Sequence, residues 1–304
     1  MNSNGMIFLV GDNPFHNISH FSQDRTRIRD KKATTPEHAT DLLEYSLANG
    51  ADGFMFSVSN TTLSILSELR KRNCIHRLSL YAIVPYASDY VQLSTQVGGI
   101  PNLAKRIIGD MILSKSLSSM LTGSVGFLKS DPVALLKTYI TYEINRIKSS
   151  AGKRVRIDCL ILHEVLTDLG LALDFDWLFK SYIQIVKKKG ITPGFNTINS
   201  ACLIQKFSDW GIDASEITLV SPFNKIGFQM SPSKEGCEKA LTRLSKPNLI
   251  AISVLAAGYL KPTEAIEYLA TLPNLRGVAV GVSKEKHAVE TFKLLNKILK
   301  HTQR

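Results

Sequence analysis

Along most of its length, the sequence alternates short runs of β-branched and other apolar residues with longer segments of helical periodicity. This alternation is typical of parallel strands joined by helical crossovers. Eight strands are expected, at residues 6–10, 53–58, 78–84, 157–162, 192–196, 217–221, 249–254 and 277–282. Because a helical segment follows each strand, the sequence predicts an α/β fold, a (β/α)8 TIM barrel that forms a single domain over residues 1–304. An open doubly wound sheet is the alternative, although no GxGxxG fingerprint follows the first strand.

The helical segments carry recognisable start and stop signals. In the first, Thr35 can cap the helix, Pro36 occupies the first helical position and Gly50 ends it. The other helices are expected at residues 61–71, 132–149, 175–189, 200–210, 233–245, 262–271 and 286–299.

A helical insertion follows the third strand and occupies residues 86–131. Within it, residues 104–121 have an apolar pattern of helical spacing. The insertion begins at the carboxyl end of a strand, which is the catalytic face of a barrel. We therefore expect either a lid over the active site or an element of packing or subunit contact.

Composition limits the classes of partner. The net charge of +11 favours an anionic ligand, and the basic residues are spread out and not interleaved with aromatic ones, which argues against nucleic acid. We therefore expect a small phosphorylated or carboxylated metabolite. No apolar run reaches the ~18 residues of a membrane span, and the first residues lack the pattern of a secretory signal, so we expect neither. A homo-oligomer is compatible with the sequence.

The cysteines indicate the compartment. They lie far apart and form neither a CxxC pair nor a metal-ligand spacing: Cys74, Cys159, Cys202 and Cys237. Free thiols in a reducing compartment are the simplest interpretation, so we expect a cytoplasmic protein.

The loop after the first strand is dense in polar residues: Asp12, Asn13, His16 and His20. His16 and His20 are four residues apart, so on a helical turn they share a face. With Asp12 they are candidates for acid and base catalysis or for ligands of a divalent metal. Asn13 and His20 are candidate substrate-binding residues. The alternative is that Asp12 caps a turn and the histidines are ordinary loop residues.

The fourth strand ends in His163 and Glu164, a titratable pair that follows an apolar strand. This pair is the best candidate for a general acid and base. Tyr86, after the third strand, is a candidate proton donor or a packing residue. Further candidates for substrate binding follow the fifth and sixth strands, at Asn196, Asn224 and Lys225. Lys225 could form a Schiff base, contact an anion or simply lie on the surface.

The seventh and eighth strands end in residues suited to phosphate. Ser253 ends the seventh strand, and the small residues Ala256, Ala257 and Gly258 that follow let backbone amides approach a ligand. Ser283 and Lys284 stand where a helix opens, and His287 follows in its first turn. A helix N-terminus, a hydroxyl and a lysine together make a phosphate site, and barrels often bind phosphate near these two strands.

Three segments together resemble the aldo-keto reductases, a family of (β/α)8 barrels that use NADPH. They are residues 157–163 (IDCLILH), 253–260 (SVLAAGYL) and 281–284 (GVSK), and the resemblance covers roughly residues 155–300. It implies that His163 is the active-site histidine. It also implies that Ser253, Gly258, Ser283, Lys284 and His287 hold NADP.

The first half of the chain departs from that family. The family's catalytic tyrosine and aspartate would follow the second strand, where residues 57–60 read SVSN. Its lysine would end the third strand, where this chain has Val84 and Pro85. The usual donor pair is thus missing, which leaves His163 or Tyr86 to supply the proton.

Three functions are therefore compatible with the sequence. The first is an oxidoreductase related to the aldo-keto reductases. The second is a non-redox aldolase, lyase or isomerase that uses the His163–Glu164 pair and the Asp12, His16 and His20 group. The third is a binding protein without catalysis.

Overall fold

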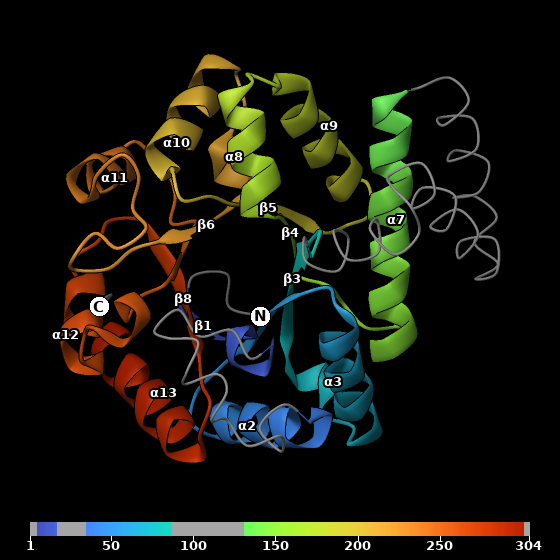
Figure 1. Cartoon of the computed structure of the whole chain (residues 1–304), viewed down its shortest axis with the longest axis vertical. Helices are drawn as coiled ribbons and strands as arrows, with labels where there is room; N and C mark the ends of the chain where they lie inside the picture. Colours follow the sequence, from blue (N-terminus) through green and yellow to red (C-terminus); the bar gives the residue numbers. More distant parts are fainter. Residues whose placement is uncertain (1–4, 17–34, 87–130, 301–304) are drawn as a thin grey trace.

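The computed structural model describes residues 5–16, 35–86 and 131–300 and shows a closed barrel of parallel strands (Figure 1). The strands pair in sequence order, and β8 closes the barrel against β1. They are β1 (Ile7–Gly11), β2 (Gly53–Ser57), β3 (Ser79–Val84), β4 (Cys159–Leu162), β5 (Thr192–Asn196), β6 (Thr218–Pro222), β7 (Leu249–Ile252) and β8 (Leu275–Gly281). The predicted (β/α)8 barrel is confirmed, and the open sheet is excluded.

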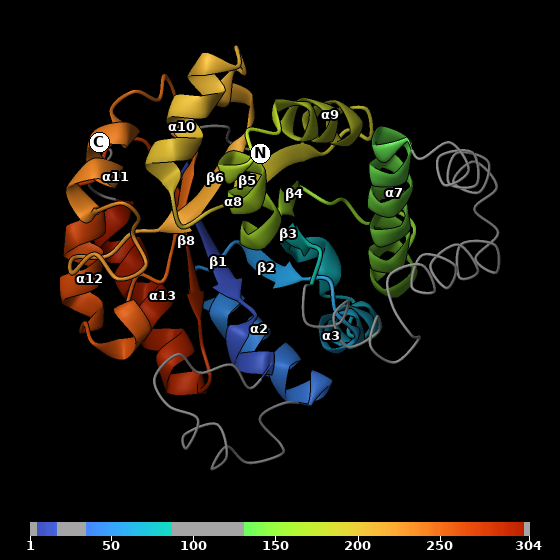
Figure 2. The same ribbon diagram turned by 45° about the horizontal axis from the view of Figure 1, so that its top comes forward.

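Helices surround the barrel (Figures 1 and 2). They are α2 (Pro36–Ala48), α3 (Asn60–Lys71), α7 (Pro132–Ala151), α8 (Glu164–Ala172), α9 (Asp176–Lys187), α10 (Ser200–Asp209), α11 (Lys234–Leu241), α12 (Pro262–Leu269) and α13 (Glu285–Leu299). All but α8 were expected from the sequence. Helix α8 contacts α9, α10 and β5, and a Cβ on Gly170 would lie 2.9 Å from the Phe179 ring. The segment after β4 is thus an extra helix rather than the loop expected there.

The apolar core has two layers, because side chains alternate across each strand. One layer fills the barrel interior and contains Leu9, Met55, Tyr81, Ile83, Cys159, Ile161, Val220, Ile250 and Ala279. The other lies between the strands and the helices and includes Phe8, Phe54, Phe56, Leu160 and Phe195. Since Cys159 and Ile161 face inward, the same alternation directs His163 inward at the catalytic end of β4.

The first helix begins and ends as its sequence predicts. The Thr35 hydroxyl accepts a hydrogen bond from the His38 amide at 3.3 Å, and Pro36 occupies the first helical position. Gly50 has φ of +101°, a conformation that suits glycine after a helix C-terminus.

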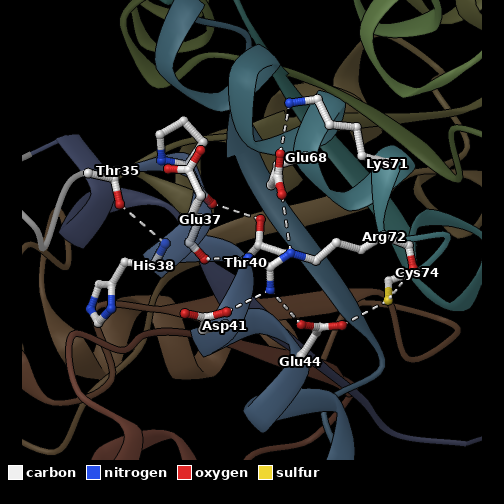
Figure 3. Close-up of polar contacts among 11 residues, drawn as sticks. Thr35, Glu37, His38, Thr40, Asp41, Glu44, Glu68, Lys71, Arg72 and Cys74 are labelled. Atoms are coloured by element: carbon white, nitrogen blue, oxygen red, sulfur yellow. Dashed lines mark hydrogen bonds and ion pairs between the residues drawn. The ribbon is translucent and has the colours of Figure 1, made fainter.

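Arg72 links α2 to α3 through three carboxylates (Figure 3). Its guanidinium lies 2.6 Å from Asp41, 2.9 Å from Glu44 and 3.3 Å from Glu68. The hydrogen bond to Asp41, above all, raises the pKa of Arg72. Glu44 also accepts a hydrogen bond from the Cys74 thiol, which raises the pKa of that thiol. One guanidinium therefore offsets the repulsion among three acidic side chains.

Replacing Arg72 with methionine should lower the free energy of unfolding by about 1–2 kcal/mol, since Asp41 and Glu44 would lose their cation and Glu68 would keep only the exposed Lys71. Urea denaturation at low and high salt measures this, and the loss should shrink at high salt. The control is Lys71→Met. Lys71 also pairs with Glu68, but its side chain is 73% exposed, so its loss should cost at most about 0.5 kcal/mol. Equal effects of the two substitutions would contradict this role for Arg72.

Two expectations fall on residues outside those described. Residues 87–130, nearly all of the expected insertion, lie outside them, so its role as lid or interface stays a prediction. The same holds for His20. Among the helices that the structure describes, none is long and apolar enough to cross a membrane.

Candidate active site

Asp12 lies directly after β1 and joins two strands. It is buried, with an exposed fraction of 5%, and its Oδ2 accepts a hydrogen bond of 2.6 Å from the Ser57 amide at the end of β2. The same oxygen lies 3.1 Å from Nε2 of His16. The short 3-10 helix η1 (Asn13–His16) brings His16 back over Asp12, because the two residues are four apart on one turn. The sequence analysis placed Asp12 and His16 in one candidate group, but it predicted neither their direct contact nor the hydrogen bond from the Ser57 amide.

The loop after β1 also rests on the end of β8. Gly11 pairs with Gly281 in the sheet, and a Cβ on Gly281 would lie 2.8 Å from the Pro14 ring. The close packing of Pro14 on Gly281 therefore fixes the path of η1. Asn13, in the same helix, is exposed. Through this contact, the Asp12–His16 pair is held beside the strand that leads to the predicted phosphate site.

Tyr86 joins this group from the end of β3. Its ring stacks on His16 with centroids 4.9 Å apart and planes inclined by 23°. The structure thus brings three of the predicted catalytic residues together: Asp12, His16 and Tyr86. Stacking limits the rotation of the His16 ring and so holds its Nε2 toward Asp12.

His163 forms the cap of α8, and this contact indicates its tautomer. Its Nδ1 accepts a hydrogen bond of 3.2 Å from the Val165 amide, so that nitrogen carries no proton. The proton of the neutral ring is then on Nε2, which leaves Nε2–H as a donor. Burial lowers the pKa of His163, although the negative charges of Glu164, Asp12 and Asp168 oppose the shift. The ring is therefore neutral at neutral pH. Glu164 is half-buried in the first turn of α8.

This lowered pKa makes stability depend on pH in a defined direction. The unfolded chain protonates its histidine at a pKa of about 6.5, above the folded value, so acid favours the unfolded state. The contribution of His163 is complete above that pKa and is lost as the pH falls through it toward the folded pKa. The urea midpoint of the wild type should therefore fall more between about pH 7.5 and 5 than that of His163→Asn. Parallel curves for the two proteins would contradict the assignment.

Asp168 on α8 is a residue of this region that the sequence analysis missed. It accepts hydrogen bonds from the Thr197 hydroxyl and, at 3.3 Å, from the Ile198 amide, which ties α8 to the end of β5. Burial raises its pKa, and these donors and His163 partly offset the rise. Only the unexpected helix brings this carboxylate near His163, so no sequence signal could have identified it.

Asn196 ends β5 with an unsatisfied polar atom. It is 6% exposed, and its Oδ1 is buried without a hydrogen-bond partner among the described residues. A buried amide oxygen left unpaired costs about 1–3 kcal/mol, and a ligand that donates a hydrogen bond would recover it. Asn196 is on the same face of β5 as Gly194, where a Cβ would contact Cys159 and Ile161 in the barrel interior. This geometry supports the predicted role of Asn196 in ligand binding.

The candidates after β6 and β7 contact each other's loops and helix α12. The buried Asn224 donates to the carbonyls of Phe228 at 2.8 Å and Ser253 at 3.3 Å, and accepts from the Phe228 amide. The exposed Lys225 pairs with Glu264 at 2.6 Å. The Ser253 hydroxyl lies 3.2 Å from the side-chain oxygen of Gln229. Substrate contact by Asn224 and Lys225 stays a prediction.

The loop after β7 has an unusual backbone. Ser253, Ala256, Ala257 and Gly258 have φ of +51°, +45°, +57° and +90°, in the left-handed region. Non-glycine residues in this region cost about 1 kcal/mol or more each, and they concentrate at functional sites. Small side chains are compatible with this path, which agrees with the prediction that the loop approaches a ligand.

Ser283, Lys284 and His287 lie where α13 begins. Lys284 is the N-cap residue of α13, and its side chain makes no capping hydrogen bond to the first backbone amides of the helix. Lys284 and His287 are exposed and Ser283 is half-buried. Since β8 is hydrogen-bonded to β1, this corner, the predicted anion site, adjoins the Asp12–His16 pair.

For metal binding, residues 5–16, 35–86 and 131–300 contain no group of three or more His, Cys, Asp or Glu side chains arranged to hold an ion. The predicted third ligand, His20, lies outside these ranges. The described part of the proposed metal group is the Asp12–His16 pair alone.

Solved structures resemble this chain along nearly its whole length. Two structures from Pseudomonas aeruginosa, provisionally described as aldo-keto reductases, have TM-scores of 0.59 at 11% and 12% identity. They cover 97% and 98% of this chain and 91% and 93% of their own. An aldo-keto reductase from Bacillus halodurans in its holo form has a TM-score of 0.55 at 10% identity, with 97% of this chain and 90% of its own covered.

No protein-family model and no curated protein matches the sequence. At 10–12% identity, the structural likeness concerns the fold. The closed barrel and these neighbours agree with the resemblance in residues 155–300. The chain therefore has the (β/α)8 fold of the aldo-keto reductases.

Proposed function

We propose that this protein is an NADP-dependent oxidoreductase that reduces a carbonyl group on a small anionic metabolite. The observation that carries the proposal is the protonation and hydrogen bonding of the His163 ring. A neutral imidazole, with Nδ1 occupied by a backbone amide, presents Nε2–H to the barrel interior. Such a donor stabilises the negative charge that develops on a carbonyl oxygen as hydride adds to its carbon.

The residues present fit a dinucleotide phosphate cofactor in two respects. The unpaired Oδ1 of Asn196 can accept from an amide group of a ligand in the barrel mouth. Ser283, Lys284 and the first amides of α13 are the donors that a phosphate requires. When bound, NADPH would supply the hydride. The proposed cofactor site extends from the beginning of α13 across the end of β8 to the mouth of the barrel.

A proton must also reach the carbonyl oxygen. The family's tyrosine–lysine pair is missing, and we assign its task to the Asp12–His16 pair, whose atoms are 3.1 Å apart. A histidine held by a carboxylate can release a proton and recover it from solvent. Tyr86 acts as a positioning residue that holds the His16 ring by stacking. The net charge of +11 supports an anionic substrate.

Titration with NADPH, followed by fluorescence, tests the proposal. We expect binding in the micromolar range. The double variant Ser283→Ala, Lys284→Ala should bind NADPH about tenfold more weakly, because two donors to the phosphate are lost, and NADH with little change. Lys293→Ala is the matched control, since Lys293 is exposed further along the same helix. Absence of NADPH binding at high micromolar concentration would overturn the proposal.

A second function is favoured by the same site. A neutral histidine at a helix N-terminus and a nearby carboxylate–imidazole pair also suit proton abstraction next to a carbonyl, as in an isomerase or lyase. The carboxylate of Asp12, held at the ends of β1 and β2 beside His16, can act as the base that such a step requires, and this favours the alternative. Deuterium exchange from solvent into phosphorylated ketones and aldehydes, without NADPH, would identify it.

A further inference from the structure

A basic cleft lies at the end of the barrel opposite the candidate active site. It has a volume of about 1040 Å³ and is formed by the C-terminal ends of α3 and α7, the turn before β3 and the loop before β4. Figure 1 shows α3 beside α7, and the two helices pack together. Because the cleft is at the amino-terminal ends of β3 and β4, it is separate from the residues around His163.

The cationic side chains of the cleft greatly outnumber its acids. Five lysines and arginines line it, together with His76 and one carboxylate, Asp158: Arg70, Lys148, Lys153, Arg154 and Arg156. Asp158 is already engaged, because it accepts from the Leu80 amide at 2.9 Å and pairs with Arg156 at 3.0 Å. Among the described residues, Lys148, Lys153 and Arg154 take part in no ion pair. Of the cations in the cleft, only Arg156 is therefore paired with a carboxylate that also lines it, and the cleft keeps a net positive charge.

Two of the cations stand at helix C-termini, where the helix dipole stabilises a positive charge. Arg70 and Lys148 stand in the last turns of α3 and α7, where a cation offsets a partial negative charge of about one half. Lys153, Arg154 and Arg156 follow the end of α7, in the loop before β4. Asp158 anchors this loop to β3, so the three cations are held at a fixed place beside the cleft. Their charge is what an anion would meet.

The lining also indicates the kind of anion. Ile75, Leu78 and Val155 supply an apolar wall beside the cations. Among the described residues that line the cleft, none is Phe, Tyr or Trp, the side chains on which nucleic acid bases stack. This combination suits a small ligand with several phosphates and an aliphatic or sugar body better than a nucleic acid strand.

We propose that this cleft is a second binding site, for a small molecule that carries two or more phosphate groups. Lys153 and Arg154 bind the phosphates, and Arg70 and Lys148 complete the positive surface from the two helices. The site does not depend on the proposed reductase function, since it shares no residue with the catalytic end of the barrel.

The experiment compares three anions by calorimetry and thermal unfolding at low salt: tripolyphosphate, a hexose bisphosphate and sulfate. Tripolyphosphate and the bisphosphate should bind and raise Tm, and sulfate should have much less effect. In Lys153→Ala, Arg154→Ala, affinity should fall about tenfold or more, because two charged donors are lost. The control Lys293→Ala, Lys297→Ala removes the same charge from the exposed face of α13 and should bind as the wild type does.

Three results would overturn the proposal. The first is no binding of either phosphorylated probe. The second is an equal loss of affinity in both double variants, which would mean that net charge alone attracts the anions. The third is an oligouridylate that binds more tightly than tripolyphosphate at equal phosphate concentration, which would identify a nucleic acid surface. The variant Ser283→Ala, Lys284→Ala, which alters only the proposed cofactor site, should bind tripolyphosphate in the cleft as tightly as the wild type does, so this test and that of the reductase function fail independently.

Discussion

Replacing His163 with asparagine should lower kcat/KM for carbonyl reduction by about 10²- to 10³-fold, the usual cost of removing one donor to a developing oxyanion. Asparagine is a good helix cap and can accept from the Val165 amide, as Nδ1 of His163 does. The variant therefore keeps α8 and loses only the ring donor. NADPH oxidation with a set of phosphorylated and carboxylated aldehydes measures the effect.

The control for this substitution is His163→Ala, which removes the cap as well. It should lose about 1 kcal/mol of stability, whereas His163→Asn should stay close to the wild type. Both should bind NADPH normally. If His163→Asn retained wild-type activity, His163 would have no role in stabilising the carbonyl oxygen, and both proposed functions would lose their central residue.

Replacing Gly53 with alanine should lower the free energy of unfolding by about 3 kcal/mol, at the upper end of the cost of overpacking a core. Gly53 begins β2, and a Cβ there would lie 2.1 Å from the carbonyl oxygen of Ser79 on β3. A backbone atom cannot move aside without breaking the pairing of the two strands. Urea denaturation followed by circular dichroism measures the loss.

Gly5→Ala is the matched control, because a Cβ on Gly5 would have no heavy atom within 4 Å. Its stability should change by less than about 0.5 kcal/mol. A stable Gly53→Ala protein would show that β2 and β3 can move apart at this point, contrary to the close register of Gly53 with Ser79.

The elements that the sequence predicts well are those with a strong local pattern. The strands are apolar on both faces because they are buried on both faces, so they are recognisable as continuous runs. Helix α2 has its cap and stop residues in the chain itself. Helix α8 was missed because its cap is a histidine, which rarely caps helices, and because Gly170 stands in its interior. Gly170 is explained only by the approach of Phe179 on α9.

The candidate site was predicted in part. Asp12, His16, His163 and Asn196 were identified because polar residues at the carboxyl ends of strands are exceptional in an apolar barrel. The Ser57 amide that binds Asp12, the carboxylate of Asp168 and the unpaired oxygen of Asn196 were not identified. Each depends on which strand or helix lies next to another, and residues far apart in the chain supply the two partners.

The sequence by itself therefore determined the barrel and the end of it at which polar residues gather, the carboxyl ends of the strands. Periodicity and turn residues are local properties that each segment of the chain carries alone. Only the tertiary structure decided the protonation of His163, the pairing of Asp12 across two strands and the basic cleft between α3 and α7. Hydrogen bonding, burial and charge density act over a few ångströms in space. Closure of the barrel sets those distances, and no single segment of the chain contains them.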